Sequence, residues 1–130
     1  MHTGSCLCGT VRFEFNGEIR RFHHCHCRTC RKAHATVYGS SALVDESKFQ
    51  ISSGEESISQ YESSPGKIRY FCRNCGTHVF ARCDRDADCV ILRLGALDGD
   101  LGIKAIGHIW VSHKPDWYEI ADDLPQSPEW

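Results

Sequence analysis

Seven of the nine cysteines in this 130-residue chain lie in three tight clusters, and this clustering constrains the fold more than any other feature. The clusters have the form CxC, CxCxxC and CxxC. Zn²⁺ takes about four ligands in tetrahedral geometry, which places ligand sulfurs about 3.8 Å apart. Side chains two or three residues apart in a turn can reach that separation, so the clusters predict bound metal.

The number of thiols in each cluster separates two kinds of site. The CxC and CxxC motifs together supply four thiolates, enough to close one tetrahedral site, and Gly76 after the CxxC permits the backbone to turn away. The CxCxxC motif supplies three thiolates and leaves one coordination position free. Closed zinc sites are usually structural, whereas open ones are often catalytic. The predicted ligands of two zinc ions per chain are Cys6, Cys8, Cys72 and Cys75 for the closed structural site, and Cys25, Cys27 and Cys30 for the open site.

The cysteine pattern favours zinc over other cysteine chemistries. A disulfide framework is disfavoured because the cysteine count is odd and CxC pairs have poor disulfide geometry. The cluster spacings do not match those of ferredoxin iron–sulfur sites. A redox CxxC would precede a helix, whereas strand-forming residues follow Cys75. Cys83 and Cys89 fit no motif, and we assign them to the core or the surface. A histidine near the CxCxxC would close the open site if it supplied a fourth ligand, and the candidates are His23, His24, His26 and His34.

Length and charge bound the remaining possibilities. The chain is the length of one domain, and we expect residues 1–130 to form a single zinc-binding unit. The formal net charge of −2 gives no reason to expect nucleic acid or an anionic membrane as a partner. No apolar run approaches the roughly 18–20 residues of a transmembrane helix, and the first residues lack a signal-peptide pattern. We therefore expect a cytoplasmic location, where clustered thiols bind metal or do chemistry.

The rest of the sequence predicts many short strands. Alternation over residues 10–15 places Val11, Phe13 and Phe15 on one face, and Asn16-Gly17 predicts a hairpin turn before a return strand at 19–24. Only residues 28–34 and a short turn at 98–102 are helical candidates, and the tail from Ala121 is predicted to be irregular. We expect a mostly β fold of small antiparallel sheets or a barrel-like arrangement, with under about one-fifth helix. Further strands are expected at 36–44, 49–52, 57–61, 67–71, 77–82, 89–94 and 106–111.

Three segments in order resemble a known family. They read GSCLCGTV at residues 4–11, CHCRTCR at 25–31 and FCRNCGT at 71–77. In these segments the chain resembles the glutathione-dependent formaldehyde-activating enzyme family, which includes centromere protein V. The likeness covers nearly the whole chain. It extends to Phe49, Gly54, Tyr61, the LGALD stretch at 94–98, the HIW stretch at 108–110, and Trp117.

The resemblance implies a β-tent, a mostly β arrangement of small sheets stitched by zinc. It also implies that the four-cysteine site holds a structural zinc and the three-cysteine site a catalytic one. The implied activity is that of an S-(hydroxymethyl)glutathione synthase, a carbon–sulfur lyase that joins the thiol of glutathione to formaldehyde. Zinc would assist either by stabilising the thiolate or by polarising the carbonyl oxygen.

Two other functions remain open at this stage. One is a non-enzymatic zinc module that binds a protein partner, and the other is a thiol-based redox or metal-buffering protein. For an enzyme, the weakest assignments are the substrate contacts. His108 and Trp110 share a face at i, i+2 of the last predicted strand, and Trp117 follows; they form either a pocket wall or ordinary core packing.

Overall fold

The computed structural model describes residues 1–130 and confirms a mostly β chain, with 17% of its residues helical. One α-helix, α1, spans Arg28–His34, where a short helix was expected. No helix is long and apolar enough to cross a membrane. The strands are β1 His2–Ser5, β2 Arg12–Phe15, β3 Arg20–Cys25, β4 Gly39–Asp45, β5 Phe49–Ser53, β6 Ile58–Ser64, β7 Lys67–Cys72, β8 His78–Cys83, β9 Cys89–Arg93 and β10 Gly107–Ile109. Five 3₁₀ turns occur at Glu46–Lys48, Glu55–Ser57, Asp84–Asp86, Leu94–Ala96 and Val111–His113.

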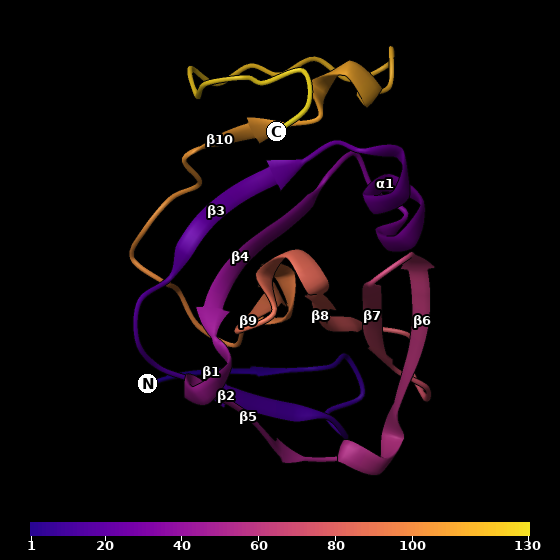
Figure 1. Cartoon of the computed structure of the whole chain (residues 1–130), viewed down its shortest axis with the longest axis vertical. Helices are drawn as coiled ribbons and strands as arrows, with labels where there is room; N and C mark the ends of the chain where they lie inside the picture. Colours follow the sequence, from indigo (N-terminus) through magenta and orange to yellow (C-terminus); the bar gives the residue numbers. More distant parts are fainter.

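The strands form two sheets. The small sheet has the order β1-β2-β5, and the large sheet has the order β10-β3-β4-β9-β8-β7-β6. Every pairing is antiparallel except that of β10 with β3. Figure 1 shows the large sheet curling round, so that β3 and β4 stand opposite β6 and β7. The antiparallel sheets agree with the fold class that the short strand patterns predicted.

The hairpin predicted at Asn16-Gly17 was wrong. Gly17 does turn the chain, with φ 87°, but β3 leaves for the large sheet. Both edges of β2 are already occupied, by β1 on one side and β5 on the other. Strand β1 was missed because its sequence, HTGS, is polar and shows no apolar alternation. Residues 98–102 form bends, and the nearest 3₁₀ turn lies at Leu94–Ala96.

The hydrophobic core lies between the two sheets. Val11, Phe13 and Phe15 are each at most 1% exposed, as their alternation predicted. They belong to one buried cluster with Val44 and Leu92 of the large sheet. Burying such side chains contributes roughly 1.5–3 kcal/mol each relative to exposure. One face of the large sheet is therefore fixed against the small sheet.

The other face of the large sheet points into the curl. Side chains alternate along a strand, and the register aligns Leu43 with Ile91, Ile91 with Ala81, and Ala81 with Arg69. Arg93, two residues beyond Ile91, points to this same side. A row of residues from four strands thus shares the concave face, and two of them are charged.

The tail from Ala121 is irregular, as expected, and it runs beside β10 (Figure 1). The His108 amide donates to the Pro125 carbonyl at 2.8 Å, and the Ser127 amide donates to the His108 carbonyl at 2.9 Å. The Trp110 amide donates to the Glu129 carbonyl at 2.7 Å. These bonds satisfy the outer edge of β10.

Two glycines with positive φ allow a matched test of this packing. A Cβ at Gly54, φ 77°, would overlap the carbonyl oxygen of Thr10, whereas a Cβ at Gly17 would meet only the Lys48 side chain at 3.4 Å. We expect Gly17→Ala to lower the free energy of unfolding by about 1–2 kcal/mol, from backbone conformation alone. Gly54→Ala should lower it by about 3 kcal/mol or more. Urea unfolding measures both, and equal losses would contradict the packing described.

Candidate metal centres and cavity

Four cysteine sulfurs from distant parts of the chain meet in one cluster, which we call the closed cluster. Cys6 and Cys8 follow β1, Cys72 ends β7, and Cys75 lies in the turn before β8. All four sulfurs lie within 4.8 Å of one another. The Cys6–Cys8 and Cys8–Cys72 sulfur distances are 3.6 and 3.8 Å, close to the ~3.8 Å edge of a tetrahedral zinc–thiolate site. The geometry brings together the set that the sequence paired.

Hydrogen bonds around the closed cluster favour the thiolate, the form that binds metal. The Thr77 hydroxyl lies 3.3 Å from the Cys75 sulfur, and hydrogen bonds from Thr77 lower the pKa of Cys75 to about 5. Thr10 lowers the pKa of Cys8 in the same way. The Val11 amide donates to the Cys6 sulfur at 3.3 Å. Burial raises the pKa of Cys72 to about 11, so these bonds favour the thiolate at Cys8 and Cys75 but not at Cys72.

Three more sulfurs meet at the start of α1, in what we call the open cluster. Cys25 ends β3, Cys27 caps the helix and Cys30 lies in its first turn. The Cys30 amide donates to the Cys27 sulfur at 3.3 Å, and the three sulfurs lie within 4.8 Å of one another. Bonds from the Cys25 and Cys27 thiols hold the pKa of Cys30 well below its usual range, and Arg93 and Arg69 add to this effect. No histidine nitrogen joins the group at this distance.

The histidines considered as fourth ligands have other partners or positions. The Nδ1 atom of His24 lies 2.8 Å from the Ser40 hydroxyl, and that of His23 lies 3.1 Å from the Arg21 carbonyl. His34 is packed against His78, and burial lowers the pKa of His34 to about 3. His26 is fully buried and bonds to His108. The open cluster thus has three sulfur donors, one fewer than a tetrahedral metal takes.

A cavity of about 790 Å³ lies against the open cluster, on the concave face of the large sheet. The three open-cluster cysteines form part of its wall, and Leu43 and Ile91 supply an apolar surface. Small-molecule sites commonly have volumes of about 300–1,000 Å³. The cavity is therefore large enough for a small peptide-like ligand.

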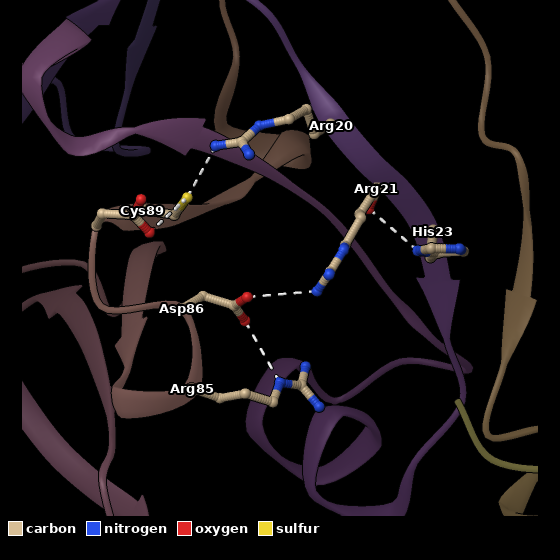
Figure 2. A network of polar contacts seen from close by, with 7 residues as sticks. Arg20, Arg21, His23, Arg85, Asp86 and Cys89 are labelled. Carbon is tan, nitrogen blue, oxygen red and sulfur yellow. Dashed lines mark hydrogen bonds and ion pairs between the residues drawn. The ribbon is translucent and has the colours of Figure 1, made fainter.

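The charge of the cavity wall is strongly positive. Its single acidic residue is Asp86, which Figure 2 shows between Arg21 and Arg85. The Asp86 carboxylate lies 3.3 Å from Arg21 and 3.5 Å from Arg85, and Arg85 also stacks 3.9 Å over the Trp130 ring. The basic residues of the wall are Arg21, Arg28, Lys67, Arg69, Arg85 and Arg93.

Sequence reasoning missed all of these basic residues except Arg28, because they come from separate elements and form no motif. One local signal was present. Arg93 ends the otherwise apolar strand segment CVILR, and a charge in a strand expected to be central implies a buried partner or ligand.

The three predicted substrate contacts are scattered. Trp110 lines the cavity, whereas His108 is buried outside it. Trp117 is 71% exposed and borders a separate hollow beside Arg28 and Lys32. The shared face of His108 and Trp110 was wrong, because β10 ends at Ile109 and Trp110 takes a left-handed conformation with φ 58°. A role of these residues in substrate binding stays a prediction.

His108 instead forms a buried hydrogen-bonded chain behind the open cluster. Its Nε2 atom lies 2.9 Å from the Asp122 carboxylate, and its Nδ1 atom lies 2.8 Å from His26 Nε2. A carboxylate accepts, so His108 donates from Nε2 to Asp122, and its Nδ1 atom shares the second hydrogen bond with His26 Nε2. Burial and then the nearby His108 lower the pKa of His26 to about 4, so its ring is neutral. This hydrogen-bonded chain holds His26 against β10, and with it the neighbouring Cys25 and Cys27.

We expect His108→Phe to lower the free energy of unfolding by about 1–3 kcal/mol, because His26 would lose its only ring hydrogen bond while buried. Asp122→Asn is the control, since the Asp122 side chain is 46% exposed and water can replace its contact. It should lose less than about 1 kcal/mol. Denaturant unfolding of both variants measures the difference. A loss for His108→Phe no larger than that for Asp122→Asn would show that the chain does not hold His26.

Comparisons with known proteins identify relatives of this chain. The family model described as glutathione-dependent formaldehyde-activating enzyme matches residues 1–113. A Halomonas elongata protein with that name, given provisionally, is 31% identical over 125 residues, which cover 90% of this chain and 79% of that protein. A Schizosaccharomyces pombe protein named as an uncharacterized lyase is 28% identical over 123 residues, covering 93% of this chain and 86% of that one.

A solved structure shares the fold. The crystal structure of a Rhodobacter sphaeroides protein superposes with a TM-score of 0.62 at 23% identity, covering 77% of this chain and 91% of the other. The family match includes all seven clustered cysteines and every strand of both sheets. The chain belongs to the glutathione-dependent formaldehyde-activating enzyme family.

Proposed function

We propose that this chain is a zinc-dependent enzyme of the carbon–sulfur lyase type, which joins glutathione to formaldehyde to give S-(hydroxymethyl)glutathione. The observation that carries the proposal is the open cluster, where three thiols converge on the wall of a cavity with no fourth ligand from the chain. The names of the family and of the Halomonas elongata relative support the substrates. The name of the Schizosaccharomyces pombe relative supports the reaction class.

The donor chemistry of both clusters fits zinc. Thiolates are the ligands of structural zinc sites, and the sulfur spacing of the closed cluster suits a tetrahedral ion. We assign Cys6, Cys8, Cys72 and Cys75 to a structural zinc and Cys25, Cys27 and Cys30 to an open one. When bound at the open cluster, zinc would stabilise the thiolate of the substrate or polarise the aldehyde oxygen.

The residues of the chain would position the substrate thiol, exclude water from it and supply positive charge. The cavity holds the thiol beside the open cluster, so that addition to the aldehyde becomes a reaction between oriented partners. The substrate sulfur forms a bond to the carbonyl carbon, the carbonyl electron pair moves to oxygen, and the proton lost by the thiol ends on that oxygen. The basic wall favours the anionic thiolate over the neutral thiol.

The cavity also favours an enzyme over the alternative of a protein-binding zinc module. A module that binds a protein presents its contacts on the surface, whereas the open cluster includes buried Cys25 and Cys30. The test is the rate of hydroxymethylglutathione formation, followed by NMR, with the rate in the absence of protein subtracted. Acceleration that requires two zinc ions per chain would support the enzyme, and an unchanged rate for the two-zinc protein would refute it.

Cys6→Ser is expected to remove about one zinc per chain and to lower the melting temperature by roughly 10 °C or more. The reason is that the closed cluster has no counterpart in the unfolded chain, so its binding energy adds to folding stability. Metal analysis and thermal unfolding measure both changes. Cys83→Ser, a cysteine outside both clusters, should change neither. Unchanged zinc content in Cys6→Ser would refute the assignment of the closed cluster.

Cys27→Ser is expected to abolish turnover and to leave the chain folded, because the closed cluster stays intact. A three-thiolate site should also hold its metal less firmly than a four-thiolate site, so its zinc should be the first lost to a chelator. Circular dichroism, zinc content and the turnover assay together check this result. If Cys27→Ser unfolds the chain as severely as Cys6→Ser, the second metal is structural and the protein-binding module becomes the better assignment.

A further inference from the structure

Three cations lie deep in the cavity without a carboxylate partner, and we call Lys67, Arg69 and Arg93 the inner cations. Arg69 on β7 and Arg93 on β9 are only 2% and 4% exposed. No aspartate or glutamate of the chain lies within 4.0 Å of any of the three. Arg21 and Arg85 of the same cavity differ, because both contact Asp86 (Figure 2). The inner cations therefore lack the partner that buried charges ordinarily have.

Several side-chain nitrogen atoms of Arg69 and Arg93 make no hydrogen bond within the chain. Arg69 donates from Nε to the Ser63 hydroxyl at 2.9 Å, and its Nη2 lies 3.8 Å from the Cys30 sulfur. Its Nη1 atom, together with Nε and Nη2 of Arg93, is buried and has no hydrogen-bond partner. A buried donor without a partner costs about 1–3 kcal/mol, and more when it is charged. The cost is removed if an anion binds between these groups.

The neighbouring groups do not supply that anion. His34 and His78 pack beside the inner arginines, and burial, followed by Arg93, lowers the pKa of both rings. These histidines are neutral and add no charge of either sign. Arg93 itself stays cationic at neutral pH, since burial lowers its pKa only to about 10.

The open cluster accounts for only part of the positive charge. Three thiolates around a divalent ion leave one net negative charge, whereas the inner cations carry three positive charges. Two positive charges remain without a counterion inside a cavity large enough for a peptide-like ligand. An anionic ligand that carries carboxylates would balance them.

We propose that the inner cations form an anion-binding subsite that receives a carboxylate of the thiol substrate. The identity of the ligand as a thiol rests on the proposed function, whereas the subsite rests on the unpartnered arginines. A guanidinium presents paired donors that match the two oxygens of a carboxylate. Because Arg69 touches the Cys30 sulfur, the subsite adjoins the open cluster and orients the ligand toward it. The substrate class is thus thiols that carry carboxylates, and neutral or cationic thiols are selected against.

The test separates carboxylate binding from thiol chemistry. S-methylglutathione keeps both carboxylates but has no free thiol, and its dimethyl ester lacks the carboxylate charges. Calorimetric titration of the zinc-loaded protein should show the parent compound binding roughly tenfold to a hundredfold more tightly than the ester. The ratio of the two affinities, S-methylglutathione over its dimethyl ester, should fall toward one in Arg93→Gln and in Arg69→Gln. The affinity for the ester should stay unchanged.

Two further variants serve as a second test and as a control. Lys67→Gln removes a less buried inner cation and should reduce the ratio even if the arginine variants fail to fold. Arg82→Gln is the matched control, since Arg82 lies on the same sheet, pairs with Glu46 and does not line the cavity. It should keep the full ratio. Zinc content is measured in every sample.

Two outcomes would overturn the proposal. One is equal binding of the parent compound and its ester by the unchanged protein. The other is an unchanged ratio in Arg93→Gln together with loss of the second zinc, which would make the arginines counterions of the metal centre alone. Failure of the proposed function gives a different result. In that case the ratio persists and responds to the inner cations, while turnover of glutathione and formaldehyde is absent.

Discussion

The meeting of four sulfurs from two distant segments is the contact on which the remaining architecture depends. Cys6 and Cys8 lie beside the first strand of the small sheet, and Cys72 and Cys75 lie at the β7–β8 turn of the large sheet. Cys6 and Cys72 also belong to the buried core between the sheets. Fixing the two sheets together at this point leaves the opposite face of the large sheet free to curl round a cavity. The closed cluster thus lies at the junction of the two sheets, whereas the open cluster lies on the wall of the cavity.

The open cluster depends on more than its own six residues. A helix of seven residues is too short to be stable by itself, so α1 must be held by its surroundings. Its first amide, that of Arg28, donates to His113 Nδ1 at 3.2 Å, and the Arg31 side chain donates to the His113 carbonyl at 2.7 Å. The buried His26–His108 pair anchors the same loop from behind. Residues after position 113 lie outside the part that the family model matches. They contribute Asp122, which bonds to His108, and Trp130, which lines the cavity.

Sequence reasoning succeeded where the deciding interactions are local. Ligand spacing in a CxC or CxxC is set by a few residues, and the burial of Val11, Phe13 and Phe15 follows from alternation alone. Sequence reasoning failed where the position of a strand depends on which other strands pair with it. The turn at Gly17 was found, yet the strand after it belongs to another sheet, because strands β1 and β5 occupy both edges of β2.

The basic cavity was hidden for the same reason. Arg69 and Arg93 are separated by 24 positions and become neighbours only through the register of β7, β8 and β9. Arg69 looks like an ordinary strand residue when read alone, and only Arg93, at the end of an apolar strand, gave a local signal. The exposure of a charge depends on how a sheet curves, and curvature is a property of the whole sheet that no short pattern records.

The tail that runs beside β10 gives the large sheet a protected margin. An unpaired strand edge is a template onto which another chain can add, and aggregation often begins there. Here the amide of His108 and that of Trp110 are already bonded to carbonyls of the tail. Pro125 and Pro128 have no amide hydrogen to offer, so the tail cannot pass the ladder on to a further strand. The irregular tail therefore terminates the large sheet at its β10 edge.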